Sequence, residues 1–156
     1  MCGIAGVIDL RGERTAEAPL LERMAAAIVH RGPDEDGFLY RPGVAFANRR
    51  LSIVGLSDGR QPIFNEDGSV AVVFNGELFD YPEKKAQLIA KGHVFRTSCD
   101  TELFVHLWEE YGEAMFAHLR GQYAFALYDS KRREVILGRD RLGICPFHWA
   151  RQIGRA

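Results

Sequence analysis

The chain has 156 residues, a length that suits one domain with a single hydrophobic core. Its formal net charge at pH 7 is −1, so it lacks the strongly basic character that nucleic acid or an acidic membrane surface attracts. The cysteines are three and far apart, at positions 2, 99 and 145, and no Cys-x-x-Cys or His-Glu-x-x-His pattern occurs. With no apolar run of membrane length and no signal peptide, we expect a cytoplasmic domain without a disulfide framework, a structural zinc or a membrane partner.

The first half of the chain predicts short strands around one helix. Residues 3–9 are predicted to form a buried strand, and residues 17–29 a helix. The apolar face of this helix consists of Leu20, Leu21, Met24 and Ile28. A turn follows at 30–34, because Gly-Pro-Asp cannot extend a helix. Residues 44–48 and 51–54 are further strand candidates.

The second half carries the stronger signals. Residues 70–74 are almost continuously apolar, as in a central strand covered on both faces. Helices are predicted at 82–91, with a proline in the first turn, and at 101–111. The apolar stripe of the second helix consists of Leu103, Phe104, Leu107, Trp108 and Tyr111. Residues 123–128 and 134–137 predict a hairpin in which small alanines let a second sheet approach. The pattern predicts two packed sheets with helices outside.

Cys2 stands directly behind the initiator Met, and its side chain is small enough for Met removal to be expected. The mature chain would then begin with a thiol beside a free α-amine. Part of such an amine is unprotonated near neutral pH and can take the thiol proton. Cys2 is therefore a candidate nucleophile activated by its own amine. The alternative is a small buried hydrophobe in the first strand.

Two further segments have both a structural and a functional interpretation. Arg50 is followed by apolar residues that would hold its guanidinium in a partly buried place, where it could bind a carboxylate; otherwise it is solvated. Asn75-Gly76 follows the predicted central strand and is most often a turn. The alternative is an oxyanion hole built from the Asn75 carboxamide and the Gly76 backbone N–H, since glycine lets a substrate come close.

The start of the second predicted helix and a loop near the end of the chain carry the remaining polar signals. Asp100 is expected to cap the helix, and at the edge of a cleft the same carboxylate could hold an ammonium group. Residues 138–146 are charged and contain two glycines, and by themselves they indicate only a surface loop.

The motifs are more specific together than singly. In chain order they are Met1-Cys-Gly-Ile-Ala-Gly, His30-Arg-Gly-Pro-Asp, Arg50-Leu-Ser-Ile-Val, Gln61-Pro62, Asn75-Gly-Glu-Leu-Phe-Asp-Tyr, Asp100-Thr-Glu and Gly138-Arg-Asp-Arg-Leu-Gly-Ile. This order and spacing closely resembles the glutaminase domain of class II glutamine amidotransferases, in the asparagine synthetase branch. The resemblance runs from Cys2 to about Pro146. It implies an α+β fold, the N-terminal-nucleophile hydrolase αββα sandwich of two antiparallel sheets flanked by helices, and hydrolysis of L-glutamine to glutamate and ammonia.

The resemblance also implies roles for individual residues. Cys2 matches the nucleophile and its freed amine the base. Asn75 and Gly76 match the oxyanion hole. Arg50 matches the residue that binds the α-carboxylate of glutamine. The residues that match the surroundings of its α-amino group are Glu77 and Asp100.

Two departures from the family pattern stand out. Cys145 occupies a position where the family typically has Lys, near the exit toward the synthetase half. The chain also stops at Ala156, so residues 2–156 are expected to be a C-terminally shortened glutaminase domain without its synthetase domain. No cofactor is expected here, and ATP and Mg²⁺ belong to the missing domain. The expected partners are glutamine and a synthetase domain that receives ammonia, with no nucleic acid. The alternative is a non-catalytic module of the same fold that senses glutamine or docks a synthetase subunit.

Overall fold

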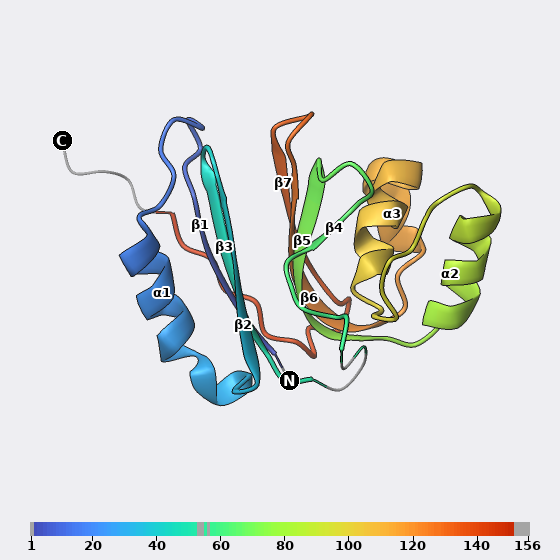
Figure 1. The fold of residues 1–156 in the computed structure, drawn as a ribbon, viewed down its shortest axis with the longest axis horizontal. Helices are drawn as coiled ribbons and strands as arrows, with labels where there is room; N and C mark the ends of the chain where they lie inside the picture. Colours follow the sequence, from blue (N-terminus) through green and yellow to red (C-terminus); the bar gives the residue numbers. More distant parts are fainter. Residues whose placement is uncertain (1, 53–54, 56, 152–156) are drawn as a thin grey trace.

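Two antiparallel sheets pack face to face, with helices on both outer sides (Figure 1). The structure is a computed structural model that describes residues 2–52, 55 and 57–151. Helix α1 (Ala18–Ala27) covers the first sheet and α3 (Glu102–Tyr111) covers the second, with α2 (Tyr81–Ala90) packed on α3. Two 3₁₀ turns, η1 (Val29–Arg31) and η2 (Gly112–Ala117), follow α1 and α3. The predicted αββα sandwich is confirmed.

The first sheet has the strand order β1-β3-β2. Its strands are β1 (Gly3–Ile8), β2 (Glu35–Arg41) and β3 (Val44–Arg50), all paired antiparallel. Side chains alternate along β3, so that Val44 and Phe46 face the second sheet while Ala45 and Ala47 lie under α1. The small alanines let α1 approach and bury its Leu21.

The second sheet has the strand order β4-β5-β6-β7. Its strands are β4 (Ile63–Phe64), β5 (Val70–Leu78), β6 (Gly121–Asp129) and β7 (Glu134–Arg139), again antiparallel. The predicted central strand is confirmed in β5. Val72 and Phe74 pack against α3, while Ala71 and Val73 face the first sheet. The predicted hairpin is β6-β7, and Ala126 faces the first sheet as expected.

Helix α3 joins the largest cluster of buried residues. Its predicted stripe is buried at Leu103, Phe104, Leu107 and Trp108, and Gly112 ends the helix with φ of +55°. Proline in the first turn of α1 and α2 suits both helix starts, because its missing N–H would have no partner there.

Several expectations for the first half were wrong. The first strand is not fully buried, because β1 is an edge strand whose residues are mostly half-buried. Helix α1 ends at Ala27, and Leu20 is 40% exposed rather than part of the buried face. Leu51 and Ser52 belong to no strand, and residues 53–54 lie outside the described part. Strands β2 and β4 were not predicted at all.

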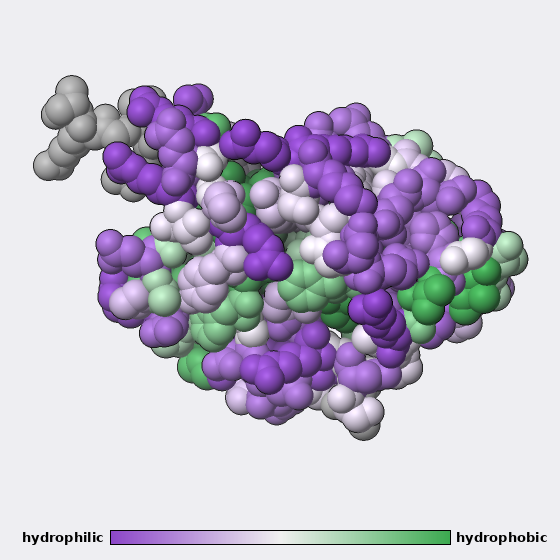
Figure 2. Space-filling view, turned by 45° about the horizontal axis from the view of Figure 1, so that its top comes forward, coloured by the Kyte–Doolittle hydropathy of each residue, from purple (hydrophilic) through white to green (hydrophobic). Residues whose placement is uncertain are grey.

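The molecular surface is mostly hydrophilic on the face that Figure 2 shows. Hydrophobic side chains appear on it between the two halves of the sandwich and at the end that carries α2. Among the described residues, no helix has the length and apolar character to cross a membrane.

Candidate active site

A cavity of about 110 Å³ opens where the first sheet, the end of β5 and the start of α3 meet. It is lined by Cys2, Arg50, Leu51, Gln61, Phe74, Gly76, Glu77, Cys99, Asp100, Thr101 and Gln122. We call it the Cys2 cavity. It brings together five of the six residues expected at the site, and these come from four separate segments of the chain. The sixth, Asn75, is not among its lining residues.

Cys2 immediately precedes β1 and is half-buried. Its thiol donates to the Leu51 carbonyl oxygen over 3.7 Å, and its own carbonyl accepts a 3.1 Å hydrogen bond from Arg31 Nε. The backbone is therefore tied to the His30–Asp34 segment, while sulfur faces the cavity. The packing interpretation of Cys2 as a small buried hydrophobe does not fit this position.

A second thiol, that of Cys99, also lines the cavity but has a different environment. It is 4% exposed and lies 3.2 Å from Thr101 Oγ1 and 3.6 Å from Asp100 Oδ1. Burial raises the pKa of the Cys99 thiol above its ordinary value, and the nearby Asp100 carboxylate adds to this. Cys99 therefore stays protonated at neutral pH and is a poor nucleophile.

Asn75 and Gly76 do not form a turn, because both lie inside β5. On the β5 edge that faces away from β6, the N–H of Phe74 is bound by Gln61 Oε1 at 2.6 Å and the N–H of Leu78 by Asp100 Oδ2 at 2.9 Å. Alternate residues of an antiparallel strand direct their N–H groups to the same side, so the Gly76 N–H points into the cavity between these two bonds.

Only glycine fits at position 76. Its φ is +147°, and an added Cβ would lie 2.0 Å from the Gln122 carbonyl oxygen. Asn75 is buried with 3% exposure, on the side of β5 that faces the first sheet, and its Oδ1 has no hydrogen-bond partner among the described residues. The Asn48 carboxamide beside it binds the Phe74 carbonyl at 3.3 Å and ties the two sheets together at this point.

Arg50 is not solvated, since its side chain is only 3% exposed. Its guanidinium pairs with Glu35 at 2.6 Å and also donates to the Gly55 carbonyl. The fork of the guanidinium is thus fixed in the cavity wall by a carboxylate from β2. Sequence reasoning missed Glu35, because nothing local indicates that β2 pairs with β3.

Asp100 and Glu77 give the cavity two carboxylates. The expected helix-capping role of Asp100 was wrong: Thr101 is the N-cap of α3, and Asp100 instead binds the N–H of Leu78. Burial raises the pKa of the Asp100 carboxyl, and the neighbouring charge of Glu77 raises it further. Each of two neighbouring carboxylates makes the charged form of the other less favourable, and a cation bound between them relieves this repulsion.

Gln61 is a polar residue of the cavity to which no role was assigned from the sequence. It is 4% exposed, and its Nε2 donates to Thr101 Oγ1 at 3.4 Å while its Oε1 holds the Phe74 N–H. It therefore links β5 to the start of α3 across the cavity floor. The Gln61-Pro62 motif was the available signal, but a motif does not reveal a cross-strand bond.

The predicted surface loop at 138–146 is confirmed from residue 140 onward, where Arg141, Leu142 and Ile144 are exposed, but not at its start. Its first residues extend β7, and Asp140 is 5% exposed because its carboxylate accepts four backbone N–H bonds. The donors are Tyr123, Leu142, Ile144 and Cys145. Burial alone would raise the pKa of Asp140, but these bonds lower it below its ordinary value. The thiol of Cys145 is fully buried beneath the loop.

Two packed antiparallel sheets between helices, with a cysteine at the entrance to the first strand, define the N-terminal-nucleophile hydrolase fold. Solved structures share it. The allosteric regulatory enzyme of purine biosynthesis aligns with a TM-score of 0.54 at 23% identity, over 88% of this chain and 31% of that one. Glutamine phosphoribosylpyrophosphate amidotransferase from B. subtilis aligns with a TM-score of 0.52 at 22% identity, over 88% and 31%. At such identities the likeness establishes the fold.

The chain belongs to the glutamine amidotransferase domain family, whose model matches residues 1–156. It is 44% identical over 151 residues to asparagine synthetase [glutamine-hydrolyzing] 2 of Bacillus subtilis (strain 168), covering 96% of this chain and 20% of that protein. It is 40% identical over 148 residues to asparagine synthetase [glutamine-hydrolyzing] 2 of Oryza sativa subsp. japonica, covering 95% and 25%. The chain thus spans a quarter or less of the length of these two relatives.

Proposed function

We propose that this domain hydrolyses L-glutamine to L-glutamate and ammonia, with Cys2 as the nucleophile once Met1 has been removed. The observation that carries the proposal is the Cys2 cavity, which gathers a thiol, a buried guanidinium, two carboxylates and an inward-pointing backbone N–H. Glutamine presents an amide, a carboxylate and an ammonium group, and each finds a complementary partner there. Membership of the glutamine amidotransferase domain family supports the same reaction.

Binding uses the two ends of the amino-acid group. The guanidinium of Arg50 would bind the α-carboxylate, because its planar fork matches a carboxylate and burial strengthens the contact. The substrate carboxylate then competes with or joins Glu35, which already holds the guanidinium in place. Asp100 and Glu77 would receive the α-ammonium group. This arrangement leaves the side-chain amide directed toward Cys2.

Acylation begins when the free α-amine of Cys2 takes the thiol proton. The thiolate sulfur bonds to the amide carbon, and the carbonyl electrons move onto oxygen. Gly76 N–H and the Asn75 carboxamide would stabilise this oxyanion, an interaction worth about 2.7–4 kcal/mol for each donor. The C–N bond then breaks, and the ammonium of Cys2 returns its proton to the leaving nitrogen, which departs as ammonia and leaves a thioester.

Deacylation reuses the same groups. The α-amine takes a proton from water, whose oxygen attacks the thioester carbon, and the same oxyanion forms again. Collapse breaks the C–S bond, so that glutamate is released and the thiol regains its proton. Cys99 takes no part, since burial keeps its thiol protonated.

The ammonia is proposed to pass to an asparagine-synthetase-like domain or subunit in the cytoplasm. The support is that both named relatives are glutamine-hydrolysing asparagine synthetases several times longer than this chain. ATP and Mg²⁺ would be needed by that synthetase part and not by the cavity described above.

The proposal is tested with a glutamine analogue that carries an electrophilic carbon in place of the amide. Peptide mapping after labelling should place the adduct on Cys2, and Cys2→Ala should abolish both labelling and glutamate release. Cys145→Ala, which removes a buried thiol outside the cavity, serves as the matched control and retains both. An adduct on Cys99, or glutamate release by Cys2→Ala, would refute the assignment. If a chain shown to begin at Cys2 binds glutamine but does not hydrolyse it, the result would favour the alternative function of a non-catalytic glutamine sensor.

A further inference from the structure

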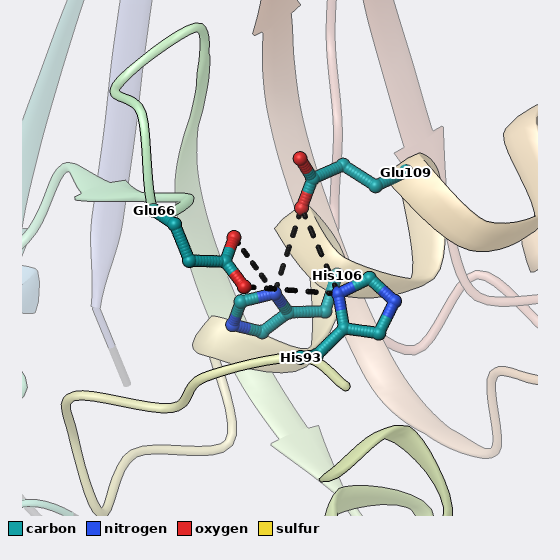
Figure 3. A group of neighbouring side chains, drawn as sticks. All are labelled: Glu66, His93, His106 and Glu109. Carbon is teal, nitrogen blue, oxygen red and sulfur yellow. Dashed lines mark ion pairs between the residues drawn. The ribbon is translucent and has the colours of Figure 1, made fainter. Parts of the chain in front are cut away.

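Four potential metal-ligating side chains from three segments meet beside α3 (Figure 3). Glu66 comes from the turn between β4 and β5, and His93 from the loop after α2. His106 and Glu109 lie three residues apart on α3. One nitrogen or oxygen atom from each lies within 4.8 Å of the others. We call this group the imidazole cluster.

The distances within the imidazole cluster are close to those around a tetrahedral ion. His106 Nδ1 lies 3.6 Å from Glu66 Oε2 and 3.6 Å from Glu109 Oε2. His93 Nδ1 lies 3.9 Å from Glu66 Oε1 and 3.9 Å from Glu109 Oε2. Zinc bonds of about 2.0–2.2 Å in tetrahedral geometry place ligand atoms roughly 3.3–3.6 Å apart. Small side-chain movements would therefore bring all four atoms into coordination.

His106 supplies independent support. Its side chain is 0% exposed, yet neither ring nitrogen has a hydrogen-bond partner among the described residues. Buried polar atoms nearly always have partners, and an exception points to an unseen ion or group. The ring is fixed from the sides by Phe95 and His93, with centroids 4.3 and 5.1 Å away. It is therefore a rigid nitrogen ligand aimed at two carboxylates.

The two carboxylates of the cluster are each held by their second oxygen. Glu66 Oε1 accepts the Val94 N–H at 2.9 Å, and Glu109 Oε1 accepts Asn65 Nδ2 at 2.7 Å. This leaves Oε2 of both residues directed at His106 Nδ1, while His93 Nδ1 lies 3.9 Å from Glu66 Oε1 and 3.9 Å from Glu109 Oε2.

A further carboxylate faces the outer ring nitrogen of each imidazole, within hydrogen-bond distance at His93 and just beyond it at His106. His93 Nε2 lies 3.4 Å from Glu110 Oε2, and His106 Nε2 lies 3.6 Å from Glu102 Oε1. A histidine that binds a metal commonly donates its other ring N–H to a carboxylate, which fixes the tautomer and makes the ligand nitrogen more basic. In both histidines of the cluster, Nδ1 faces inward and Nε2 faces such a carboxylate.

We propose that Glu66, His93, His106 and Glu109 bind a divalent transition ion of the zinc type. Two imidazoles and two carboxylates suit Zn²⁺, and four protein ligands fill a tetrahedral shell, as in structural sites. The ion would fasten the β4–β5 turn and the loop after α2 to α3, and the residues directly before α3 line the Cys2 cavity. The site lacks the sequence spacing of known zinc motifs, which is why the sequence predicted none.

The experiment titrates the chelator-stripped full chain with Co²⁺ and then Zn²⁺. One equivalent of Co²⁺ should produce the visible absorption of a tetrahedral ion without a thiolate charge-transfer band in the near ultraviolet, and Zn²⁺ should displace it. At a free Zn²⁺ concentration about 100 times the dissociation constant, Tm should rise by about 5–10 °C. A thiolate band would place the ion at a cysteine and overturn the proposal.

Matched variants localise the binding. His93→Gln, His106→Gln and Glu109→Gln should each weaken Zn²⁺ binding more than about 100-fold, and Glu110→Gln, which removes a backing carboxylate, about 10–100-fold. His118→Gln is the control, because His118 stacks on Tyr111 outside the cluster. If His106→Gln fails to fold, His93→Gln and Glu109→Gln decide. No saturable binding, or unchanged affinity in these two folded variants, would show that the cluster is only a network of histidines and carboxylates without an ion.

Discussion

The Cys2 cavity and the imidazole cluster are two concentrations of polar side chains, one beside the residues that precede α3 and one on α3 itself, and they satisfy their charges differently. In the cavity, Arg50 already has Glu35 and Asp100 already has the Leu78 N–H, so the side chains are positioned before any substrate arrives. In the cluster, His106 is buried without a hydrogen bond. The arrangement in the cavity is preorganised for a substrate that binds and is released, whereas the arrangement in the cluster suits a permanently bound structural ion.

The two regions are also mechanically connected through the start of α3. Glu102 is buried and accepts the N–H groups of Arg96 and Thr97 at 2.7 Å each, while its Oε1 faces His106 Nε2. Burial would raise the pKa of Glu102, but these bonds and the His106 contact lower it to about 2. Because no residue that lines the cavity is a ligand in the cluster, we expect changes in the cavity to alter turnover and to leave metal binding intact.

The largest expected effect concerns the start of the chain. A residue left in front of Cys2 converts its amine to an amide, which cannot accept a proton at neutral pH. We expect retained Met1 or an uncleaved N-terminal tag to reduce glutamate release by more than about 10³-fold, while Zn²⁺ affinity stays unchanged. Intact-mass spectrometry establishes the N-terminus, and the same tag placed after Ala156 is the control. Comparable turnover by a chain that keeps its extension would mean another base, and His30 would be the first to test.

Asn75→Ala should act on the transition state. Its carboxamide is proposed to bind charge that develops during attack, so kcat should fall by about 10²–10³-fold with little change in KM. Asn48→Ala, which removes the neighbouring inter-sheet bond but no proposed catalytic donor, is the comparison variant. Steady-state kinetics decide: a higher KM with unchanged kcat for Asn75→Ala would contradict the oxyanion role.

Arg50→Ala should act on binding. The contact to the α-carboxylate exists in the ground state and the transition state alike, so KM should rise by about 30–100-fold while kcat changes little. Glu35→Gln leaves the guanidinium in place, and we expect a much smaller change in KM. An equal loss of kcat and kcat/KM in Arg50→Ala would instead indicate that Arg50 acts only in the transition state.

Asp100→Asn should produce the smallest loss of activity in this series. It should not reduce stability at neutral pH. Loss of the negative charge should raise KM for glutamine about tenfold, as expected for one charged hydrogen bond. The folded-state pKa of Asp100 lies above its unfolded value, so the folded protein binds this proton more tightly and loses stability as pH rises through that window. At neutral pH the variant should therefore be at least as stable as the wild type, because Asn can still accept the Leu78 N–H.

The same prediction has a pH signature. As pH falls below the raised pKa, the wild-type carboxyl becomes neutral and the difference in Tm between wild type and Asp100→Asn should shrink. Thermal melts between neutral and acidic pH measure this. A variant that is less stable than the wild type at neutral pH and approaches it on acidification would mean that the pKa of the buried carboxyl is lowered and that its charge is stabilising.

The sequence by itself determined the elements whose patterns are long and unambiguous. The stripe from Leu103 to Trp108 gave α3, the apolar run from Val70 gave β5, and the alternation from Tyr123 gave β6, because each pattern reflects a face that must be buried. Arg50, Gly76, Glu77 and Asp100 could be proposed as neighbours of Cys2 because their motifs together matched one family.

Only the tertiary structure decided which interpretation each polar residue follows. Glu35–Arg41 begins with two acidic residues and becomes a strand through pairing with β3, so no local pattern predicted it. Asn75-Gly76 is strand rather than turn because Gln61 and Asp100 bind the free edge of β5. The imidazole cluster joins residues up to 43 positions apart, Glu66 to Glu109. Such contacts depend on how β4, α2 and α3 pack against one another, and this packing cannot be predicted from the order of the residues in the chain.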